Sequence, residues 1–388
     1  MRVCSSREYS RDRKKGHLMV EIPKKSKAAV LEEYNRPLKI QEYPIPEVEL
    51  GGILVRIEMA GICGTDVHQW RGELGLKAPL PNIPGHETVG RIVKLGGDSM
   101  RDCAGEELHI GDRMMWAHVS CGSCFWCTIA HQPTICPNRV LYGIRHSNAY
   151  PHLTGGFAEY EYIMPGTEMI KVPEELLNEE VIGVGCAFRT VVSAFERLRG
   201  VGTQESVVIQ GSGPIGLYST LLAAEGGAGK VIVVGAPKIR LELAKRWGAD
   251  HIINIEEVPD PSQRLAEILK LTERRGPDVV VEASGGPTAF REGLEMVRRG
   301  GRYLVIGQGS LELTASIVPG LVALKHLEVI GNCSAEIGHY AKALQFIKGK
   351  RQKYSFADIV TKKYPLNQIN DALAAMEAGR EIKPVILP

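Results

Sequence analysis

The sequence predicts an α/β protein in which a mostly antiparallel β domain is followed by a doubly wound domain with a parallel sheet. The 388 residues are too many for one ordinary core and fit two domains. Up to about residue 162, short runs of alternating apolar and polar residues are cut by Gly and Pro, which favours antiparallel strands. From about residue 188, continuous apolar runs alternate with helical stretches, as in a parallel sheet covered by helices.

The domain boundaries follow these changes of pattern. We expect a flexible leader over residues 1–26, a first domain over 27–187, and a second domain over 188–333. The tail, 334–388, is expected to return to the first domain and complete it. Strands are expected at 53–57, 89–93, 207–209, 231–234 and 279–281. Helices are expected at 217–224, 241–247, 340–347 and 369–378.

Charge and hydropathy exclude several classes of partner. The chain has 47 basic and 45 acidic residues, a net charge of +2, which gives no field of the kind that gathers nucleic acid or membranes. The basic leader lacks an apolar stretch, so it is not a secretory signal. The most apolar segment, 207–224, is interrupted by Gln210 and Pro214 and does not fit a membrane span. We therefore expect a cytoplasmic protein that binds neither nucleic acid nor membrane.

A glycine-rich turn lies at the start of the second domain. The run Gly211-Ser212-Gly213-Pro214-Ile215-Gly216 follows one predicted strand and opens a predicted helix. In this context the first glycine permits the turn, the second lets a pyrophosphate approach the backbone, and the third lets helix and strand pack closely. The run therefore predicts a dinucleotide site.

Four of the nine cysteines, Cys121, Cys124, Cys127 and Cys136, lie within one short segment. In a reducing compartment such spacing indicates metal ligands rather than disulfides. Four thiolates complete a tetrahedron around zinc and leave no open position, so the expected role is structural.

A third group is scattered along the chain. It comprises Cys63, His86 in the run Gly85-His86-Glu87, and Cys186. Each residue alone is more often a buried core residue than a ligand. Together they offer two thiolates and one imidazole, a set that would hold zinc with a fourth position open for chemistry.

In these motifs and their order the chain resembles the medium-chain dehydrogenase/reductase family, and within it the zinc-containing alcohol dehydrogenases. The resemblance covers about residues 28–388, and it includes the closing run Gly379-Arg-Glu-Ile-Lys383-Pro-Val. It implies a GroES-like catalytic domain, a Rossmann coenzyme domain, two zinc ions per chain, NAD or NADP, and a homodimer or homotetramer. The implied reaction moves a hydride between a primary or secondary alcohol and NAD(P), giving an aldehyde or ketone.

The resemblance also implies roles for individual residues. Cys63, His86 and Cys186 would bind the catalytic zinc, with Glu87 as a neighbouring group or alternate ligand. Asp66 would accept a hydrogen bond from the far nitrogen of His86 and fix its tautomer. The remaining two catalytic residues form a proton relay: Thr65 would bond the substrate oxygen, and His68 would pass its proton to solvent.

Cofactor choice depends on the end of the strand predicted at 231–234. NAD-linked members of the family usually place an acidic residue there, whereas this chain has Gly235. Lys238 and Arg240 follow and could pair with a 2′-phosphate, so we expect NADP over NAD. Lys383 of the closing run is the last residue expected at the cofactor.

Two alternatives stay open. One is a zinc-dependent dehydrogenase of a polyol, an amino alcohol or a biosynthetic intermediate; the thiol of Cys186, where polyol and threonine dehydrogenases often have a carboxylate, weakens this assignment. The other is a non-catalytic protein that binds zinc and nucleotide. Three segments, Trp116 to His118, Val140 to Pro151 and Ile317 to Leu324, are expected to line the cleft or subunit contacts, and their sequences identify no substrate.

Overall fold

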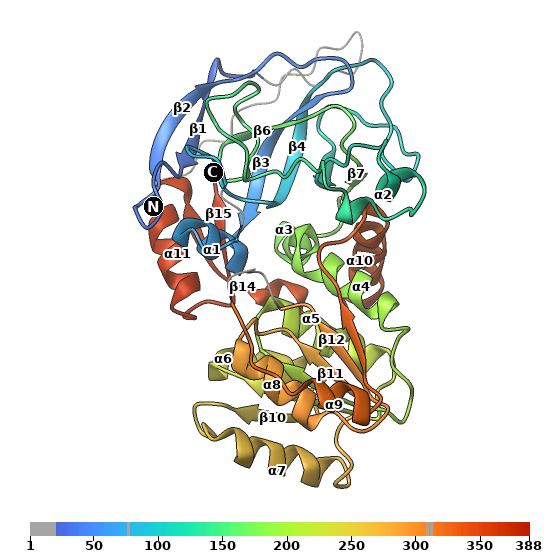
Figure 1. The fold of residues 1–388 in the computed structure, drawn as a ribbon. Helices are drawn as coiled ribbons and strands as arrows, with labels where there is room; N and C mark the ends of the chain where they lie inside the picture. Colours follow the sequence, from blue (N-terminus) through green and yellow to red (C-terminus); the bar gives the residue numbers. More distant parts are fainter. Residues whose placement is uncertain (1–20, 76–77, 308–309, 311–312) are drawn as a thin grey trace.

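The computed structural model describes residues 21–75, 78–307, 310 and 313–388, and it divides into an antiparallel β half and an α/β half (Figure 1). Residues 1–20 of the predicted leader lie outside this description. Strand β1 begins at Lys25, one residue before the expected end of the leader, and Ser26 within it is fully buried. None of the helices in the described residues is long and apolar enough to cross a membrane.

The first half contains a seven-stranded sheet and a separate hairpin of two strands. The hairpin strands are β1 (Lys25–Val30) and β2 (Lys39–Pro44). The larger sheet contains β3 (Ile53–Gly61), β4 (Glu87–Leu95), β5 (Arg113–Trp116), β6 (Tyr160–Ile163) and β7 (Met169–Lys171) from this half. The helical segments are α1 (Gly64–Arg71), α2 (Phe125–Thr128), η1 (Pro133–Ile135), α3 (Asn178–Val181) and η2 (Ile182–Gly185).

The second half is a six-stranded sheet in which every pair of neighbours is parallel. Its strands are β8 (Ser206–Gln210), β9 (Lys230–Gly235), β10 (His251–Asn254), β11 (Val279–Glu282), β12 (Arg302–Val305) and β13 (Glu328–Gly331). Its helices are α4 (Ala187–Arg197), α5 (Pro214–Glu225), α6 (Lys238–Arg246), α7 (Pro261–Leu271), α8 (Pro287–Met296) and α9 (Pro319–Leu324). The spatial order β10-β9-β8-β11-β12-β13 confirms the doubly wound arrangement. The order reverses between β8 and β11, which is where such sheets bind ligands.

The C-terminal tail contacts the first half of the molecule. Its elements are α10 (Ile337–Lys350), η3 (Phe356–Ile359), β14 (Val360–Pro365), η4 (Leu366–Gln368), α11 (Ile369–Glu377) and β15 (Lys383–Leu387). Strand β15 pairs antiparallel with β3, so the last strand of the chain joins the sheet of the first half (Figure 1).

One hydrophobic core continues across both halves. Val89 of β4, Phe188 of α4, Leu217 of α5 and Val281 of β11 are all fully buried members of it. Because α4 packs against both α5 and α10, the segment that follows Cys186 is held between the two halves. This packing fixes the position of the site described below.

Candidate active site

A cavity of about 460 Å³ opens between the two halves. Cys63, His86 and Cys186 line it from the first half, and Gly213 lines it from the glycine-rich turn. Three residues of the run 140–151 also line it: Leu141, Tyr142 and Ile144. The cavity therefore joins the scattered cluster to the predicted dinucleotide site.

The scattered residues come together in space. Ligand-type atoms of Cys63, His86, Glu87 and Cys186 all lie within 4.8 Å of one another. They come from three places in the chain: Cys63 immediately precedes α1, His86 and Glu87 lie at the start of β4, and Cys186 immediately precedes α4. The set is two thiols, one imidazole and one carboxylate, which suits zinc.

Neighbouring groups orient these side chains. The Nδ1–H of His86 donates to Oδ1 of Asp66 at 3.1 Å, which orients the ring and leaves Nε2 as the nitrogen available to a metal. The other carboxylate oxygen of Asp66 accepts from the backbone N–H of Cys63 at 2.8 Å. Asp66 is 1% exposed, so one buried carboxylate positions two members of the cluster.

Glu87 is paired on one side and free on the other. Its Oε2 accepts from Nζ of Lys383 at 2.5 Å, and both side chains are fully buried. Its Oε1 is buried without a hydrogen-bond partner among the described residues. A buried carboxylate oxygen of this kind is costly unless it meets a donor or a cation. The residues present therefore fit a cation next to Glu87.

Electrostatics in the cluster favour the thiolate of Cys63 and the neutral forms of Glu87 and Cys186. A hydrogen bond from Cys186 holds the pKa of the Cys63 thiol well below its usual value, and His86 acts in the same direction. Burial raises the pKa of Glu87 to about 7, against the positive charge of Lys383. The same hydrogen bond and burial raise the pKa of Cys186 well above its usual value. A divalent cation would lower the pKa of both groups and hold them as ligands.

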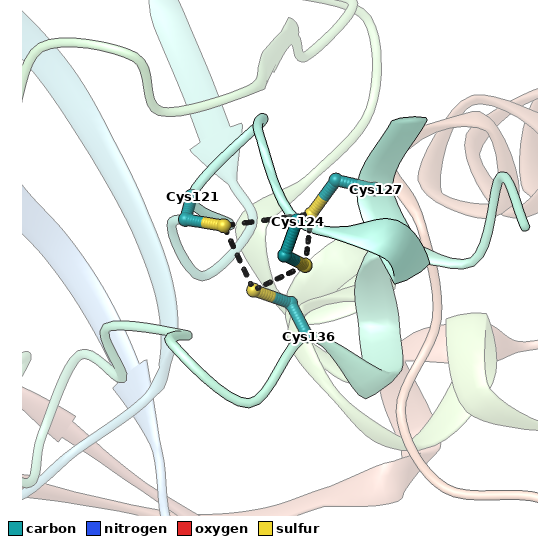
Figure 2. Close-up of side chains that lie close together, drawn as sticks. All are labelled: Cys121, Cys124, Cys127 and Cys136. Carbon is teal, nitrogen blue, oxygen red and sulfur yellow. Dashed lines mark hydrogen bonds between the residues drawn. The ribbon is translucent and has the colours of Figure 1, made fainter. Parts of the chain in front are cut away.

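The four-cysteine segment forms a second cluster, in which all four sulfur atoms point toward one another (Figure 2). Neighbouring Sγ atoms lie 3.5 to 4.0 Å apart. Cys124 precedes α2, Cys127 lies within it, and Cys136 follows η1, so two short helical turns set the spacing. The donor set fits a closed four-thiolate zinc site.

The glycine-rich turn has the tight geometry that a dinucleotide site needs. Gly211 has φ +106°, and a Cβ there would lie 2.8 Å from the backbone of Ala283. A Cβ on Gly216 would lie 1.9 Å from the carbonyl oxygen of Gly211. A Cβ on Gly213 meets nothing within 4 Å, because this residue faces the cavity where α5 begins at Pro214. The free N–H groups of that helix start therefore face open space that suits a pyrophosphate.

The residues expected to select the cofactor do not all lie in the same hollow of the structure. Gly235 ends β9, and a Cβ there would lie 2.6 Å from Oγ of Ser212. Lys238 and Arg240 line a neighbouring hollow, and Arg240 also lines the main cavity. Lys383 lines the main cavity too, but its ammonium group pairs with Glu87, an interaction that the sequence did not indicate.

The two residues of the expected relay lie one helical turn apart on α1. Thr65 Oγ1 is 3.6 Å from Sγ of Cys63, and both Thr65 and His68 line the cavity. Nδ1 of His68 lies 3.2 Å from a carboxylate oxygen of Glu73, a partner that the sequence analysis missed. Thr65 and His68 share no direct hydrogen bond among the described residues, so a proton passing between them needs a bridging hydroxyl or water.

Comparisons with known proteins agree with this arrangement. Residues 49–174 match the alcohol dehydrogenase GroES-like domain, and residues 214–349 match the zinc-binding dehydrogenase domain. The chain is 34% identical to 5-exo-hydroxycamphor dehydrogenase from Pseudomonas putida over 93% of its length and 98% of that protein. It is 31% identical to an alcohol dehydrogenase from Geobacillus stearothermophilus, over 93% of this chain and 99% of the relative.

A solved structure extends the likeness to the fold. The alcohol dehydrogenase of Thermotoga maritima aligns with a TM-score of 0.86 and 36% identity, covering 94% of this chain and 99% of that one. The fold, the reaction class and the requirement for zinc and a nicotinamide cofactor that the sequence predicts are thereby confirmed. The chain belongs to the zinc-containing alcohol dehydrogenases of the medium-chain dehydrogenase/reductase family.

Proposed function

We propose that the cluster of Cys63, His86, Glu87 and Cys186 binds a catalytic zinc, and that the alcohol reacts beside it with a nicotinamide cofactor held by the glycine-rich turn. One observation carries this proposal: four donors from three separate elements converge beside the same cavity that the turn at Gly213 faces. When bound, zinc makes an alcohol oxygen more acidic and the nicotinamide ring accepts a hydride.

The chain's own residues would then orient donors and move a proton. Asp66 orients the ring of His86 so that Nε2 is the nitrogen directed at the cluster. The hydroxyl of Thr65, next to Cys63, would hold the substrate oxygen, and His68 would release the proton to solvent, since its side chain is 40% exposed.

We also propose that Cys121, Cys124, Cys127 and Cys136 bind a second, structural zinc. Metal analysis of the purified protein tests both assignments together. Two zinc ions per chain are expected. One zinc would contradict the two-site assignment and favour a non-catalytic zinc protein. Oxidation of simple alcohols with cofactor reduction then identifies the enzyme, whereas activity confined to polyols or amino alcohols would favour the alternative substrate class.

The preference for NADP is the finest part of the proposal. Two observations support it: β9 ends in Gly235 rather than an acidic residue, and Nε of Arg240 is buried without a partner among the described residues. Nη2 of Arg240 donates to the backbone oxygen of Glu381 at 2.8 Å, so the guanidinium is held at the edge of the hollow that it shares with Lys238. A 2′-phosphate would supply the acceptor that Nε lacks.

The ratio of kcat/KM for NADP and NAD on one alcohol tests this preference. Arg240→Met should lower the ratio about tenfold, since a charge-assisted hydrogen bond is lost. Gly235→Asp should lower it further, but any Cβ at this position meets Ser212. Gly235→Ala is the matched control, because it introduces the Cβ without the charge. A wild-type preference for NAD would contradict the proposal.

A homodimer or homotetramer in the cytoplasm remains our expectation for the assembly and its location. Apolar side chains on the outer strand of the parallel sheet, on α9 and on the residue before α9 support a subunit contact there: Val329 is 45% exposed, Leu324 75% and Val318 64%. This region includes the segment Ile317 to Leu324 that the sequence analysis singled out. Light scattering on the purified protein tests the oligomeric state, and a monomer would contradict it.

A further inference from the structure

The charge of the cavity wall is one-sided. Among the described residues that line the cavity, four are arginine or lysine and none is aspartate or glutamate. Arg240 and Lys383 have been accounted for, by the cofactor hollow and by Glu87. The remaining two, Arg139 and Arg189, lie near the metal cluster and have no assigned role.

We propose that Arg139 and Arg189 bind an anionic group of the substrate, so that the preferred substrate is an alcohol or carbonyl compound that also carries a carboxylate or a phosphate. This inference rests on the proposed function, because it assigns a substrate class to the same site.

The two guanidinium groups meet at one hydroxyl. Nη2 of Arg139 donates to Oγ of Ser334 at 3.1 Å, and Nη1 of Arg189 donates to the same oxygen at 3.0 Å. All three residues line the cavity. They come from three separate parts of the chain. Arg139 follows the four-cysteine segment, Arg189 lies in the first turn of α4, and Ser334 lies in the connection between β13 and α10. Convergence of two cations on one oxygen is a built arrangement rather than an accident of surface composition.

Donor groups remain unused at this point. Nε of Arg139 is buried without a partner, and Nη2 of Arg189 has none among the described residues. The hydroxyl of Ser334 accepts from both arginines, so its own hydrogen is left to donate. An oxyanion placed beside Ser334 would accept from all three groups, with the fork geometry that arginine offers to carboxylate and phosphate.

The charge here lacks a counterion. Neither arginine has a carboxylate within 4.0 Å among the described residues, although Arg189 is only 2% exposed. Arg189 instead lies over the ring of Tyr340, at 4.9 Å from its centroid. Burial and the charge of Arg189 lower the pKa of Arg139, which shows that the two cations repel each other. A buried cation next to a half-buried one, neither of them paired with a carboxylate, is unfavourable, and an anionic ligand reduces the penalty.

Two further features shape the same corner. Nδ1 of His118 accepts from the backbone N–H of Tyr142 at 3.1 Å, and burial together with both arginines holds the pKa of His118 well below its usual value. His118 is therefore a neutral ring with its hydrogen on Nε2, and it lines the cavity as an additional donor. Ser334 has φ 65°, a left-handed conformation that is strained for serine and is common at functional sites.

A structural account of the arginines is the competing explanation. Arg139 also donates to the backbone of Thr134, and Arg189 to that of Gly185, so the pair could serve only to balance the thiolates of Cys136 and Cys186. That account predicts loss of zinc when either arginine is replaced. It does not explain why donors remain unused where the two groups meet.

Substrate series provide the first test. The zinc-loaded enzyme is assayed with ω-hydroxycarboxylates, with ω-hydroxyalkyl phosphates, and with uncharged alcohols of the same chain lengths. We expect kcat/KM at the best chain length to be at least about tenfold higher for one anionic series than for the uncharged alcohol, because a charge-assisted hydrogen bond is lost without the anion. The two anionic series distinguish carboxylate from phosphate. Equal or better turnover of the uncharged alcohols overturns the inference and leaves the proposed function intact.

Variants provide the second test. In Arg139→Met and Arg189→Met the ratio of kcat/KM for the anionic substrate and its uncharged partner should fall about 10- to 100-fold, mainly through KM. Arg139→Lys should recover part of the ratio, since it keeps the charge but not the fork. Arg101→Met is the matched control, because Arg101 is exposed and lies outside the cavity. An unchanged ratio together with loss of zinc would establish the structural account instead.

Binding decides the case in which no alcohol of any series is oxidised, a result that would contradict the proposed function. The ω-hydroxycarboxylates are then titrated calorimetrically into the zinc-loaded protein with reduced cofactor bound. Binding that is lost in both arginine variants supports the proposed anion site. Binding that is absent, or unaffected by the two variants, overturns it.

Discussion

The two ligand clusters of this protein contrast in how the chain builds them. The sulfur atoms of Cys121, Cys124, Cys127 and Cys136 come from one segment, and local turns bring them together. The donors of Cys63, His86, Glu87 and Cys186 come from three separate elements and meet only when the first half is folded against α4. The first cluster contributes order to its own loop, whereas the second depends on order supplied by the rest of the protein.

The clusters also differ in their chemistry. Four thiolates fill all four coordination positions of zinc. The second set contains a carboxylate with one unpaired oxygen, and it lies beside a cavity that can admit an external ligand in competition with that oxygen. The contrast leads to four predictions, which follow in order of decreasing effect.

Cys63→Ser should cause the largest loss of activity. A catalytic metal supplies several kcal/mol of transition-state stabilisation, so kcat/KM should fall by about three orders of magnitude or more. The fold should survive, because the core around β3 and β4 does not depend on this metal. We expect one zinc per chain by metal analysis and a circular dichroism spectrum like that of the wild type. Unfolding of this variant would show that the catalytic cluster, like the four-cysteine cluster, is needed for stability.

Cys124→Ser should act on stability instead. The lobe has little core of its own, since Phe125 and Ile129 are 59% and 68% exposed, so its order depends on the metal. Loss of that zinc should lower Tm by about 5 °C or more and reduce kcat less than Cys63→Ser does. Cys103→Ser, which alters an exposed thiol in neither cluster, is the control. If the Cys63 and Cys124 variants exchanged these phenotypes, our division of the cysteines would be wrong.

The same contrast explains what could be predicted from the sequence. The four-cysteine segment and the turn from Gly211 to Gly216 are local patterns that can be recognised from their spacing. In the structure the four sulfur atoms lie within 4.8 Å of one another, and the turn connects β8 to α5. Helix ends were less accurate: α5 begins at Pro214 and α10 extends from Ile337 to Lys350, beyond the apolar runs that indicated them. Pro at the first position explains the earlier start of α5, since its missing N–H costs nothing there.

Contacts between distant segments could not be predicted from the sequence. Ser334 lies 145 residues from Arg189 in the chain, so no spacing pattern joins them. Lys383 was expected at the cofactor because of the closing run, but the antiparallel pairing of β15 with β3 brings it to Glu87. The members of the catalytic cluster have no common local period, so their donor types suggested a zinc site and the family resemblance was needed to assign each residue its role.

His68→Gln tests whether the catalytic cluster needs a route that carries the alcohol proton to solvent. The four-cysteine cluster, which has a structural role, needs no such route. We expect alcohol oxidation to slow about tenfold below neutral pH, with part of the rate restored as hydroxide rises and replaces the missing acceptor. The pH profile of kcat is the measurement. Glu73→Gln is the companion variant, because it removes the partner of His68 and keeps the imidazole. An equal loss at every pH would exclude the relay.

The smallest effect concerns thiol reactivity in metal-free protein. Backbone N–H groups of Ser123 and Cys124 lower the pKa of Cys121 to about 5, whereas burial and neighbouring thiols raise that of Cys127 to about 11. Cys121 is therefore already a thiolate near neutral pH, and its labelling rate by iodoacetamide should stay flat between about pH 6 and pH 8. The rate for Cys127 should rise about tenfold per pH unit over the same range, because its thiolate is the minor form.

Peptide mass spectrometry after timed labelling measures both rates, and adding cofactor sharpens the comparison of the clusters. At pH 7 Cys121 should react only about tenfold faster than Cys127, since a low pKa also weakens the nucleophile. Zinc should protect thiols in both clusters. NADP should slow labelling of Cys63, which lines the cavity, and leave Cys121 unchanged, because Cys121 lies outside it. Equal rates for Cys121 and Cys127, or protection of Cys121 by the cofactor, would mean that the lobe and the cavity are not the independent sites that their geometry indicates.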